Sequence, residues 1–528
     1  MKKFLWLFTA LVLVAFLNAQ PKEYEGRAVW AHPGDFGKSE KEVEEFFKIL
    51  KKSNIELLVP LVKDTAGNIF WHSKKFPQAI HPDYKDFDLL RAITKCGRLY
   101  NIRVHAWLCD FPEGKESAAF KLHPEWAMVN PQGGYTSEEK VTPDVVYGSV
   151  WMCPARRPGY TDQWLLPMIE EIVRDYDVDG IHHDYVRYPG DVAPDTYCFC
   201  DYCLEHFFKY NHFYYFNRPQ DRIPLKKERV REEANWDSDF TVNPPNWLQM
   251  SREQKAEFIL SGKSINRSDL DYFFYQARCD AITDFVREAW ERASKIKPGV
   301  EFSAAVFINP MLSGRFIGQR WTDFAPWVDI IMPMNYRSHF QGSFDDYLDY
   351  LGEIVQAQVG WCKGKSHLYA GIDAHYIFKE EREPWEKALA VLKKGQGAEA
   401  QKEELENLME KNIAYLRNFS AQRAKDLDEA FSSFLKGKIQ KEGFAAEINK
   451  VLSDPPAGFF PEEKLVRTIE AVRKAQAEGI VIFAASLISG KKLWSGVEKA
   501  YSSPAKAPDK SLPLKDYLSI QAVRKTQK

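Results

Sequence analysis

The chain has 528 residues, which is enough for one large domain with insertions or for several domains of ordinary size. Hydrophobic residues make up 45% of it and charged residues 28%, which is the composition of a soluble globular protein. The formal net charge of −2 gives no reason to expect nucleic acid or an anionic membrane as a partner.

The first twenty residues, MKKFLWLFTALVLVAFLNAQ, have the form of a cleavable secretory signal. Two lysines precede an apolar run from Phe4 to Leu17, and Asn18 and Ala19 follow it. The run is shorter than the roughly 20 residues of a membrane-spanning helix, so a retained membrane helix is the less favoured alternative. We therefore expect a signal peptide over residues 1–19, no membrane span after its cleavage, and a periplasmic or secreted protein.

Apolar runs of strand length then alternate with longer stretches of helical periodicity. The first run, Gly26–Pro33, precedes an amphipathic helix over Ser39–Asn54, for which Ser39 is the predicted N-cap. Further strands are predicted at Ile55–Asp64, Ile102–Pro112 and Asp179–Gly190, with helices around Asp86–Asn101 and Pro158–Tyr176 between them.

The second half repeats this alternation after a long predicted helix over Asp269–Lys295. Strands are predicted at Val300–Pro310, Val328–Arg337, His367–Tyr376 and Gly479–Gly490, and helices at Phe344–Gln358, Pro461–Glu478 and from about Leu493. Eight βα units in series is the count of an α/β protein with the (β/α)8 TIM-barrel fold. A doubly wound open sheet is the alternative, but no Gly-rich phosphate loop follows the first strand.

Three segments exceed ordinary loop lengths and are predicted to be insertions in a barrel domain over residues 24–503. They cover about residues 113–157, 191–267 and 378–460, and each follows the C-terminal end of a strand, where barrels carry their active sites. The third is rich in Lys, Glu, Ala and Leu and is predicted to be helical. Residues 504–528 are predicted to form a poorly ordered tail.

The fourth predicted strand, DGIHHDYVRYPG, carries the strongest catalytic signal. If Ile181 faces the helices, strand alternation turns His182 and Asp184 toward the barrel axis. An inward aspartate at the strand end, with Arg187 nearby, is predicted to act as nucleophile, base or acid. The alternative is a structural aspartate that caps the following turn or pairs with Arg187.

Glycosidases need a second carboxyl group across the scissile bond. Asp64, Asp110, Glu113 and Asp373 are the candidates at strand ends, and we choose Asp373 on the seventh strand, with Asp110 next. The substrate-binding residues are predicted to be His182, Arg187, Asn335, Tyr336, Trp30 and His32.

A cysteine cluster gives a separate signal. The run CFCDYC places Cys198, Cys200 and Cys203 within six residues, so they cannot all pair locally but can surround one metal ion. Cys153 or His206 is the candidate fourth ligand. Disulfides are the alternative in an exported protein, but the odd number of cysteines favours a structural zinc.

Four segments together resemble the glycosyl-hydrolase-like family 10 proteins: residues 25–62, HPEWAMVNPQG, DYDVDGIHHDYVRYP and VDIIMPMNYR. The resemblance extends from Glu25 to about Ser503, outside the third insertion. It implies an exported bacterial TIM-barrel glycosidase acting on a cell-wall or polysaccharide glycan. The family's fourth strand often has a second Asp where Tyr185 stands here, which leaves Asp184 as the acidic candidate on that strand.

The cysteine cluster is similar to the zinc site of family 42 β-galactosidases, which has the same Cys-x-Cys-x-x-Cys run and one cysteine a few dozen residues upstream, where Cys153 lies. Those enzymes rely on glutamates at strand ends, and none stands at the end of strand four or seven here. We therefore expect an exported glycoside hydrolase with an oligo- or polysaccharide substrate and no organic cofactor. A barrel that binds glycans without cleaving them is the alternative, and the sequence leaves the sugar, the linkage and the oligomeric state open.

Overall fold

The computed structural model describes residues 24–142, 145–146, 148–206, 247–261, 270–394 and 399–508. The predicted signal peptide lies outside these residues, and so does the predicted tail beyond residue 508. The start of that tail is described, and Lys506 forms a parallel bridge with Tyr24. Among the described helices, none combines the length and the apolar character needed to cross a membrane.

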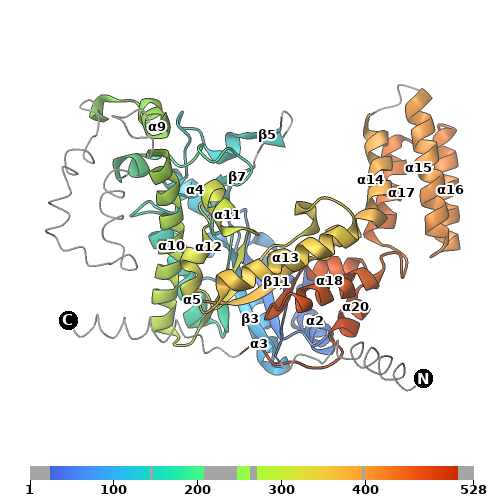
Figure 1. The fold of residues 1–528 in the computed structure, drawn as a ribbon, viewed down its shortest axis with the longest axis horizontal. Helices are drawn as coiled ribbons and strands as arrows, with labels where there is room; N and C mark the ends of the chain where they lie inside the picture. Colours follow the sequence, from blue (N-terminus) through green and yellow to red (C-terminus); the bar gives the residue numbers. More distant parts are fainter. Residues whose placement is uncertain are drawn as a thin grey trace, which may run out of the picture.

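Eight parallel strands close into a barrel in the order β1-β12-β11-β10-β9-β8-β3-β2, with helices around the outside (Figure 1). Because β1 pairs in parallel with both β2 and β12, the TIM-barrel prediction is confirmed and the open sheet is excluded. The strands are β1 Gly26–Ala31, β2 Leu57–Lys63, β3 Arg103–Cys109, β8 Gly180–Asp184, β9 Glu301–Val306, β10 Ile330–Pro333, β11 His367–Asp373 and β12 Gly479–Phe483.

Most helices that surround the strands begin within about three residues of their predicted positions, but α5 begins at Leu166, after a π-helical turn over Thr161–Leu165, and so later than the predicted Pro158. Ser39 caps α2 as predicted, because its side-chain oxygen accepts a hydrogen bond from the Glu42 backbone N–H at 3.3 Å. The helices of the barrel and its loops are α2 Glu40–Lys52, α3 Leu89–Tyr100, α5 Leu166–Asp175, α10 Leu270–Ile296, α11 Pro310–Ile317, α12 Trp321–Phe324, α13 Phe344–Cys362, α18 Glu462–Lys474, α19 Ala485–Gly490 and α20 Trp494–Ala500.

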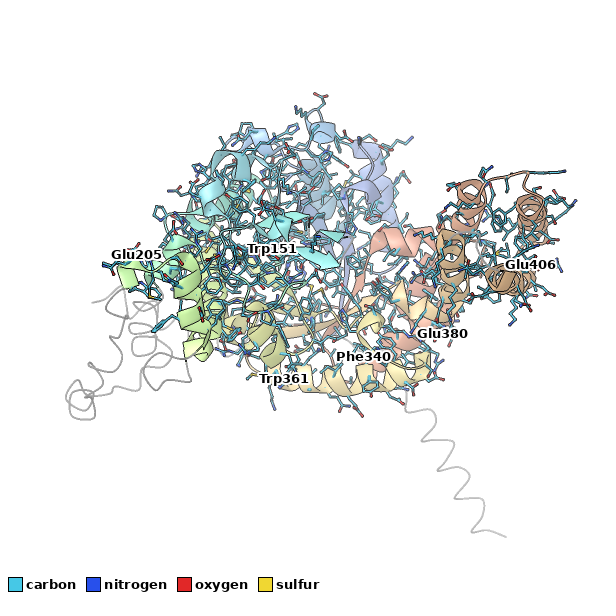
Figure 2. All side chains as sticks on the ribbon, turned by 90° about the horizontal axis from the view of Figure 1, so that it is seen from above. Trp151, Glu205, Phe340, Trp361, Glu380 and Glu406 are labelled. Carbon is cyan, nitrogen blue, oxygen red and sulfur yellow. The ribbon has the colours of Figure 1, made fainter. Side chains whose placement is uncertain are left out.

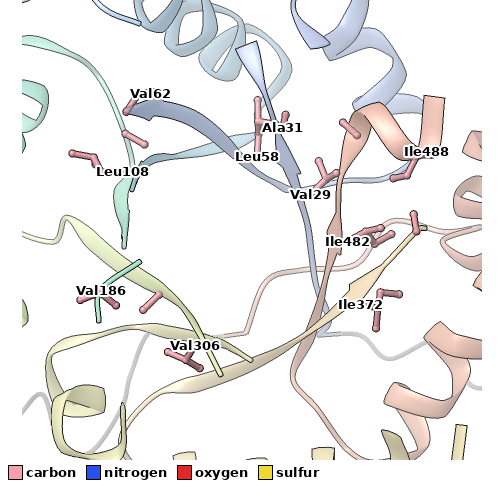
Figure 3. Close-up of a cluster of buried hydrophobic side chains, with 14 of the residues drawn as sticks. Val29, Ala31, Leu58, Val62, Leu108, Val186, Val306, Ile372, Ile482 and Ile488 are labelled. Carbon is pink, nitrogen blue, oxygen red and sulfur yellow. The ribbon is translucent and has the colours of Figure 1, made fainter. Parts of the chain in front are cut away.

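Strand alternation divides the core into two apolar layers. Residues such as Val29, Leu58 and Ile482 lie on the strand faces that meet the helices (Figure 3). The intervening residues, among them Trp30 and Trp107, fill the barrel interior. Hydrophobic burial on both faces explains why the strands read as nearly continuous apolar runs in the sequence.

The three insertions have different structures. The first contains α4 (Ala118–Leu122) and two short antiparallel pairs, β4 (Pro112–Gly114) with β7 (Ser149–Trp151) and β5 (Lys140–Thr142) with β6 (Val145–Val146). The described part of the second contains α9 (Arg252–Ser261). The third forms a group of helices that stands beside the barrel, as its composition predicts (Figure 1): α14 Lys379–Lys394, α15 Glu399–Arg417, α16 Ala421–Leu435 and α17 Lys441–Ser453.

Candidate active site

Asp184 is the last residue of β8 and lies at the C-terminal mouth of the barrel. Its Oδ2 accepts a hydrogen bond from Trp107 Nε1 at 3.1 Å, and its Oδ1 accepts one from the Tyr185 backbone N–H at 2.6 Å. Burial raises the pKa of the Asp184 carboxyl to about 6. The carboxyl group is therefore oriented by two donors and carries its proton over a pH range in which an ordinary aspartate does not.

His182 lies on the same face of β8, inside the barrel, as alternation predicts. Trp30 Nε1 donates to His182 Nε2 at 3.0 Å, so the ring proton sits on Nδ1, which donates to Ser303 Oγ at 2.8 Å. Both ring nitrogens are engaged, and neither His182 nor Trp30 has more than 2% of its surface exposed. The prediction that these two residues bind substrate is therefore corrected: they form the floor below the mouth.

The hydrogen bonds of His182 continue deeper into the barrel through Ser303. Ser303 Oγ lies 2.9 Å from His105 Nδ1, and His105 Nε2 lies 3.0 Å from Glu301 Oε2. A side chain at Gly180 would prevent this arrangement, because its Cβ would lie 2.7 Å from His105 Nε2 and 2.6 Å from the Glu301 carbonyl oxygen. The glycine of the DGIHHD motif thus allows β8 to approach β3 and β9 closely.

Aromatic rings surround the mouth above Asp184. The His32 ring centre lies 5.3 Å from that of Trp107 and 5.7 Å from that of Phe483, and Tyr336 lies 5.6 Å from Phe483. His32, Tyr336 and Phe483 are partly exposed. Phe483 and Trp107 were not among the predicted site residues, although both are aromatic residues near the C-terminal ends of strands.

Arg187 projects over the same side of the mouth. Its guanidinium carbon lies 4.7 Å from the ring centre of Tyr185, 5.1 Å from that of Trp151 (Figure 2) and 5.2 Å from that of Phe307. One N–H donates to the Tyr188 carbonyl at 3.2 Å, and within the part of the chain that the structure describes no ion pair joins Arg187 to an acid. The alternative of a structural Asp184–Arg187 salt bridge is therefore not what the structure shows, and Arg187 can meet a ligand.

Asp373 ends β11, the seventh strand of the barrel in chain order. Its Oδ1 accepts hydrogen bonds from the backbone N–H groups of His375 at 2.5 Å and Tyr376 at 2.7 Å. Burial raises the pKa of Asp373, while Lys491 and Arg382 act against the rise. Burial raises the pKa of the Tyr336 hydroxyl, and so do the charges of both Asp373 and Asp184. Both predicted catalytic carboxyls therefore lie within electrostatic range of one hydroxyl at the mouth.

Asp35 is a further carboxyl group at the end of β1, in the turn Pro33–Asp35, and the sequence analysis did not select it. Its Oδ2 accepts the His32 backbone N–H at 2.7 Å, and burial raises its pKa to about 6. The segment HPGD after the first strand was the available signal. Asp35 is the natural comparison for Asp184, since both carboxyls have a similarly raised pKa.

Two other predicted residues follow the strand ends but have fully buried side chains. Asp110 is fully buried and its Oδ2 lies 2.9 Å from His183 Nδ1, in the layer where His183 packs on Phe285 and Phe302. Asn335 is fully buried too, in a reciprocal amide pair with Gln358 of α13 at 2.8 and 3.0 Å. We therefore assign both residues to the packing between strands and helices and leave them out of the proposed site.

Glu113, another candidate from the sequence, forms a fully buried ion pair with Lys63. Lys63 Nζ lies 3.1 Å from Glu113 Oε1 and donates to the carbonyl oxygen of Cys109 at 2.7 Å. Tyr160 donates its hydroxyl to Glu113 Oε1 at 2.7 Å. The pair joins the end of β2 to the first insertion, which indicates a structural role.

Replacing Lys63 by Met is expected to lower the free energy of unfolding by about 3–5 kcal/mol, because Glu113 would remain buried without its cation. Chemical denaturation monitored by circular dichroism measures this loss. The double variant Lys63→Met/Glu113→Leu should recover much of it, and Lys38→Met, which breaks the exposed pair with Asp83, should change stability far less. A loss no greater than that of Lys38→Met would contradict a structural role for the pair.

The four predicted zinc ligands come together in the structure. The Sγ atoms of Cys153, Cys198, Cys200 and Cys203 all lie within 4.8 Å of one another, and no other group of potential metal ligands is found among the described residues. Cys153 Sγ lies 3.5 Å from Cys203 Sγ and 3.9 Å from Cys200 Sγ, and all four thiols are free. Sulfurs bound tetrahedrally to zinc at about 2.3 Å lie about 3.8 Å apart, so the cluster fits this ion.

His206 is not the fourth ligand, since its Nδ1 instead bonds the Tyr202 carbonyl at 3.0 Å. The cysteines connect the end of the first insertion to the start of the second.

The fold and the mouth define a class of protein: a TIM barrel with carboxyl groups and aromatic rings at the C-terminal ends of its strands. Residues 33–440 match a family model described as "Putative glycosyl hydrolase domain", and the chain belongs to this family. The narrower resemblance to glycosyl-hydrolase-like family 10 stays a prediction.

Solved structures provide a second comparison. The glycoside hydrolase domain of PgaB (BpsB) from Bordetella bronchiseptica has 9% identity and a TM-score of 0.53 over 90% of this chain and 98% of that domain, a likeness of fold. A β-galactosidase from Rahnella sp. R3 has 12% identity and a TM-score of 0.42 over 66% of this chain and 46% of its own. A catalytic mutant of the GH42 β-galactosidase Gan42B from G. stearothermophilus has 13% identity and a TM-score of 0.45, over 67% of this chain and 46% of its own. No curated protein matches the sequence.

Proposed function

We propose that the protein is an exported glycoside hydrolase that cleaves an oligo- or polysaccharide at the mouth of its barrel. The observation that carries the proposal is that Asp184 and Asp373 end β8 and β11 at the same face of the barrel, where the charges of both raise the pKa of the Tyr336 hydroxyl. Most glycoside hydrolases use two carboxyl groups that flank the scissile bond. Membership of a glycosyl hydrolase family supports the same activity.

Asp184 acts as the general acid in this proposal. Its raised pKa leaves a proton to give to the leaving oxygen, and the Trp107 N–H holds one carboxyl oxygen in place. Asp373 acts as the ionised partner, as base or nucleophile. Burial raises its pKa, but two backbone N–H groups and the charges of Lys491 and Arg382 oppose this rise by favouring the charged form.

The rings around the mouth provide the sugar-binding surface. The partly exposed faces of His32, Tyr336 and Phe483 can stack on the apolar faces of sugar rings, while Arg187 donates hydrogen bonds to sugar hydroxyls. The test is release of reducing ends from a panel of cell-wall and storage polysaccharides, measured with wild-type protein and the Asp184→Asn variant. Binding of a glycan without release of reducing ends would support a non-catalytic glycan-binding barrel instead.

The acid role of Asp184 predicts a pH dependence. Because the general acid must be protonated and its pKa is about 6, kcat/KM is expected to fall about tenfold per pH unit above pH 6. Initial rates on the best substrate between pH 4 and 9 measure this fall in kcat/KM. Asp35 has a similar pKa and is therefore the control. Asp35→Asn protein should show the same fall in kcat/KM above pH 6, because Asp184 is unchanged in it. A rate that instead rises as pH increases through 6 would show that Asp184 acts in its ionised form.

We also propose that Cys153, Cys198, Cys200 and Cys203 hold one structural zinc ion. Four thiolates would complete its tetrahedral shell and leave no position for water, so the ion would stabilise the insertions and take no part in the chemistry. The disulfide alternative would need sulfurs about 2.05 Å apart, well below the 3.5 Å between Cys153 and Cys203.

A further inference from the structure

Three basic side chains gather beside Asp373, where the loops after β11 and β12 meet. His375 and Arg382 belong to the β11 loop and α14, and Lys491 directly follows α19. Lys491 Nζ lies 3.3 Å from His375 Nδ1, and a guanidinium N–H of Arg382 lies 3.5 Å from the His375 carbonyl oxygen. The proposed mechanism uses none of these three residues.

Lys491 is 8% exposed, yet in the described part of the chain no carboxylate oxygen lies within ion-pair distance of its ammonium group. The acids on the neighbouring helix α14 already have other cations. Glu380 (Figure 2) pairs with Arg337 and Lys464, Glu381 with Lys464, and Glu386 with Arg382. A buried cation without an anion is unfavourable. Accordingly, burial and the charge of Arg382 lower the pKa of Lys491 to about 8, against the opposing charge of Asp373.

The next residue, Lys492, differs from Lys491 because it is exposed and pairs with an acid. Lys492 Nζ lies 3.1 Å from Asp454 Oδ1 and 2.7 Å from the Pro455 carbonyl oxygen, and its side chain is 46% exposed. The two lysines are adjacent in the chain but differ in burial and in their acid partner. Lys491 is buried in the loops around the mouth, where its Nζ lies 5.5 Å from the ring centre of Phe460 and the charge of Asp373 acts on it without a direct ion pair among the described residues.

His375 can donate a hydrogen bond next to this ammonium group. Burial lowers the pKa of His375 to about 3, so its ring is neutral at ordinary pH. Since Lys491 donates to Nδ1, the ring proton sits on Nε2. His375 is partly exposed and Tyr376 beside it is 42% exposed, so the group reaches the surface.

The geometry points to an oxyanion subsite in which Lys491, His375 and Arg382 bind a negatively charged substituent of the glycan, next to Asp373. The inference rests on the proposed function and specifies its substrate class: an acidic glycan that carries a carboxylate or a phosphate or sulfate ester. An ammonium group with unused N–H donors suits such an oxyanion. Loops after the seventh and eighth strands of a TIM barrel are also where anion sites often form.

Competitive amine labelling of the full-length protein tests this subsite. Trace acetic anhydride acetylates unprotonated amines, and mass spectrometry compares Lys491 with Lys492 in the same sample. Saturating glucuronate or glucose 6-phosphate is expected to slow acetylation of Lys491 about tenfold, by occupying the site and holding the ammonium protonated. Lys492 should be unaffected, and glucose should protect neither lysine. The anion that protects more identifies a carboxylate or a phosphate ester as the preferred group.

Unchanged labelling of Lys491 in both anions, or equal protection by glucose, would overturn the inference. The readout does not depend on catalysis, so it separates the two proposals. Protection of Lys491 in protein that hydrolyses no glycan would refute the proposed function alone. Hydrolysis of a neutral glycan without anion protection would refute the subsite alone.

Discussion

Replacing Asp184 by Asn is expected to lower kcat on the substrate by about 10³-fold, which makes it the most damaging single change at the mouth. The amide cannot donate a proton to the leaving oxygen, and general acid catalysis contributes about 10²–10⁴-fold. Asn has nearly the same volume, and its side-chain oxygen can still accept one of the two N–H groups that bond Asp184, so the fold should be kept at the loss of one hydrogen bond. Steady-state kinetics of reducing-end release, beside circular dichroism of both proteins, measure the effect.

Asp35→Asn is the matched control for this variant. Asp35 lies in the turn Pro33–Asp35 that follows β1 and also has a pKa of about 6, but its carboxyl accepts a hydrogen bond from the His32 backbone N–H. Its replacement should leave kcat within about tenfold of wild type, because it removes no proton donor from the reaction. Normal hydrolysis by folded Asp184→Asn protein, together with a collapse in Asp35→Asn, would move the acid role to Asp35.

Strand alternation predicts which way a residue within a strand points, but it does not predict the direction of residues past the strand end. Asp184 and Asp373 are the last residues of β8 and β11, so the inward parity of each strand still applies to them. Asp110 and Asn335 follow β3 and β10, which end at Cys109 and Pro333. Past those ends the backbone turns, and both side chains point into the packing against helices.

Two of the predicted substrate contacts, His182 and Trp30, lie in the core for a different reason. Alternation places His182 and Trp30 inside the barrel, but depth along the axis decides whether an inward residue meets ligand or core. Their mutual hydrogen bond and the contact with Ser303 put them below the mouth. Lys491 could not be predicted either, because it follows a short helix and reaches His375 only through the spatial adjacency of two loops.

The cysteines were predictable because their chemistry needs only proximity. Three of them are close together in the sequence. Cys153 was predicted as the fourth ligand from its upstream position, and the structure places its Sγ within 4.8 Å of the other three. The eight-fold barrel was predictable for a related reason, since the strands are buried on both faces and helices such as α2 and α3 are amphipathic.

Loss of the proposed zinc is expected to have the largest effect on stability. Purified protein should contain one zinc per chain, and Cys200→Ala should abolish it and lower the free energy of unfolding by more than about 4 kcal/mol. The reason is that Cys200 is buried and lies 3.9 Å from Cys153, so the cluster ties the two insertions together. Metal analysis by mass spectrometry and thermal unfolding with and without chelator measure both effects.

Cys96→Ala is the control, because Cys96 is a buried thiol outside the cluster, and its removal should leave the zinc content at one per chain. Thiol titration of the denatured protein in the presence of chelator then distinguishes a zinc ion from disulfides as the link between the two insertions. Zinc leaves all eight cysteines of the chain reactive, whereas disulfides would remove them in pairs. Four reactive thiols and no zinc would show that the cluster is held by two disulfides. The buried sulfurs at 3.5 to 3.9 Å are spaced for a shared ion, so we expect eight.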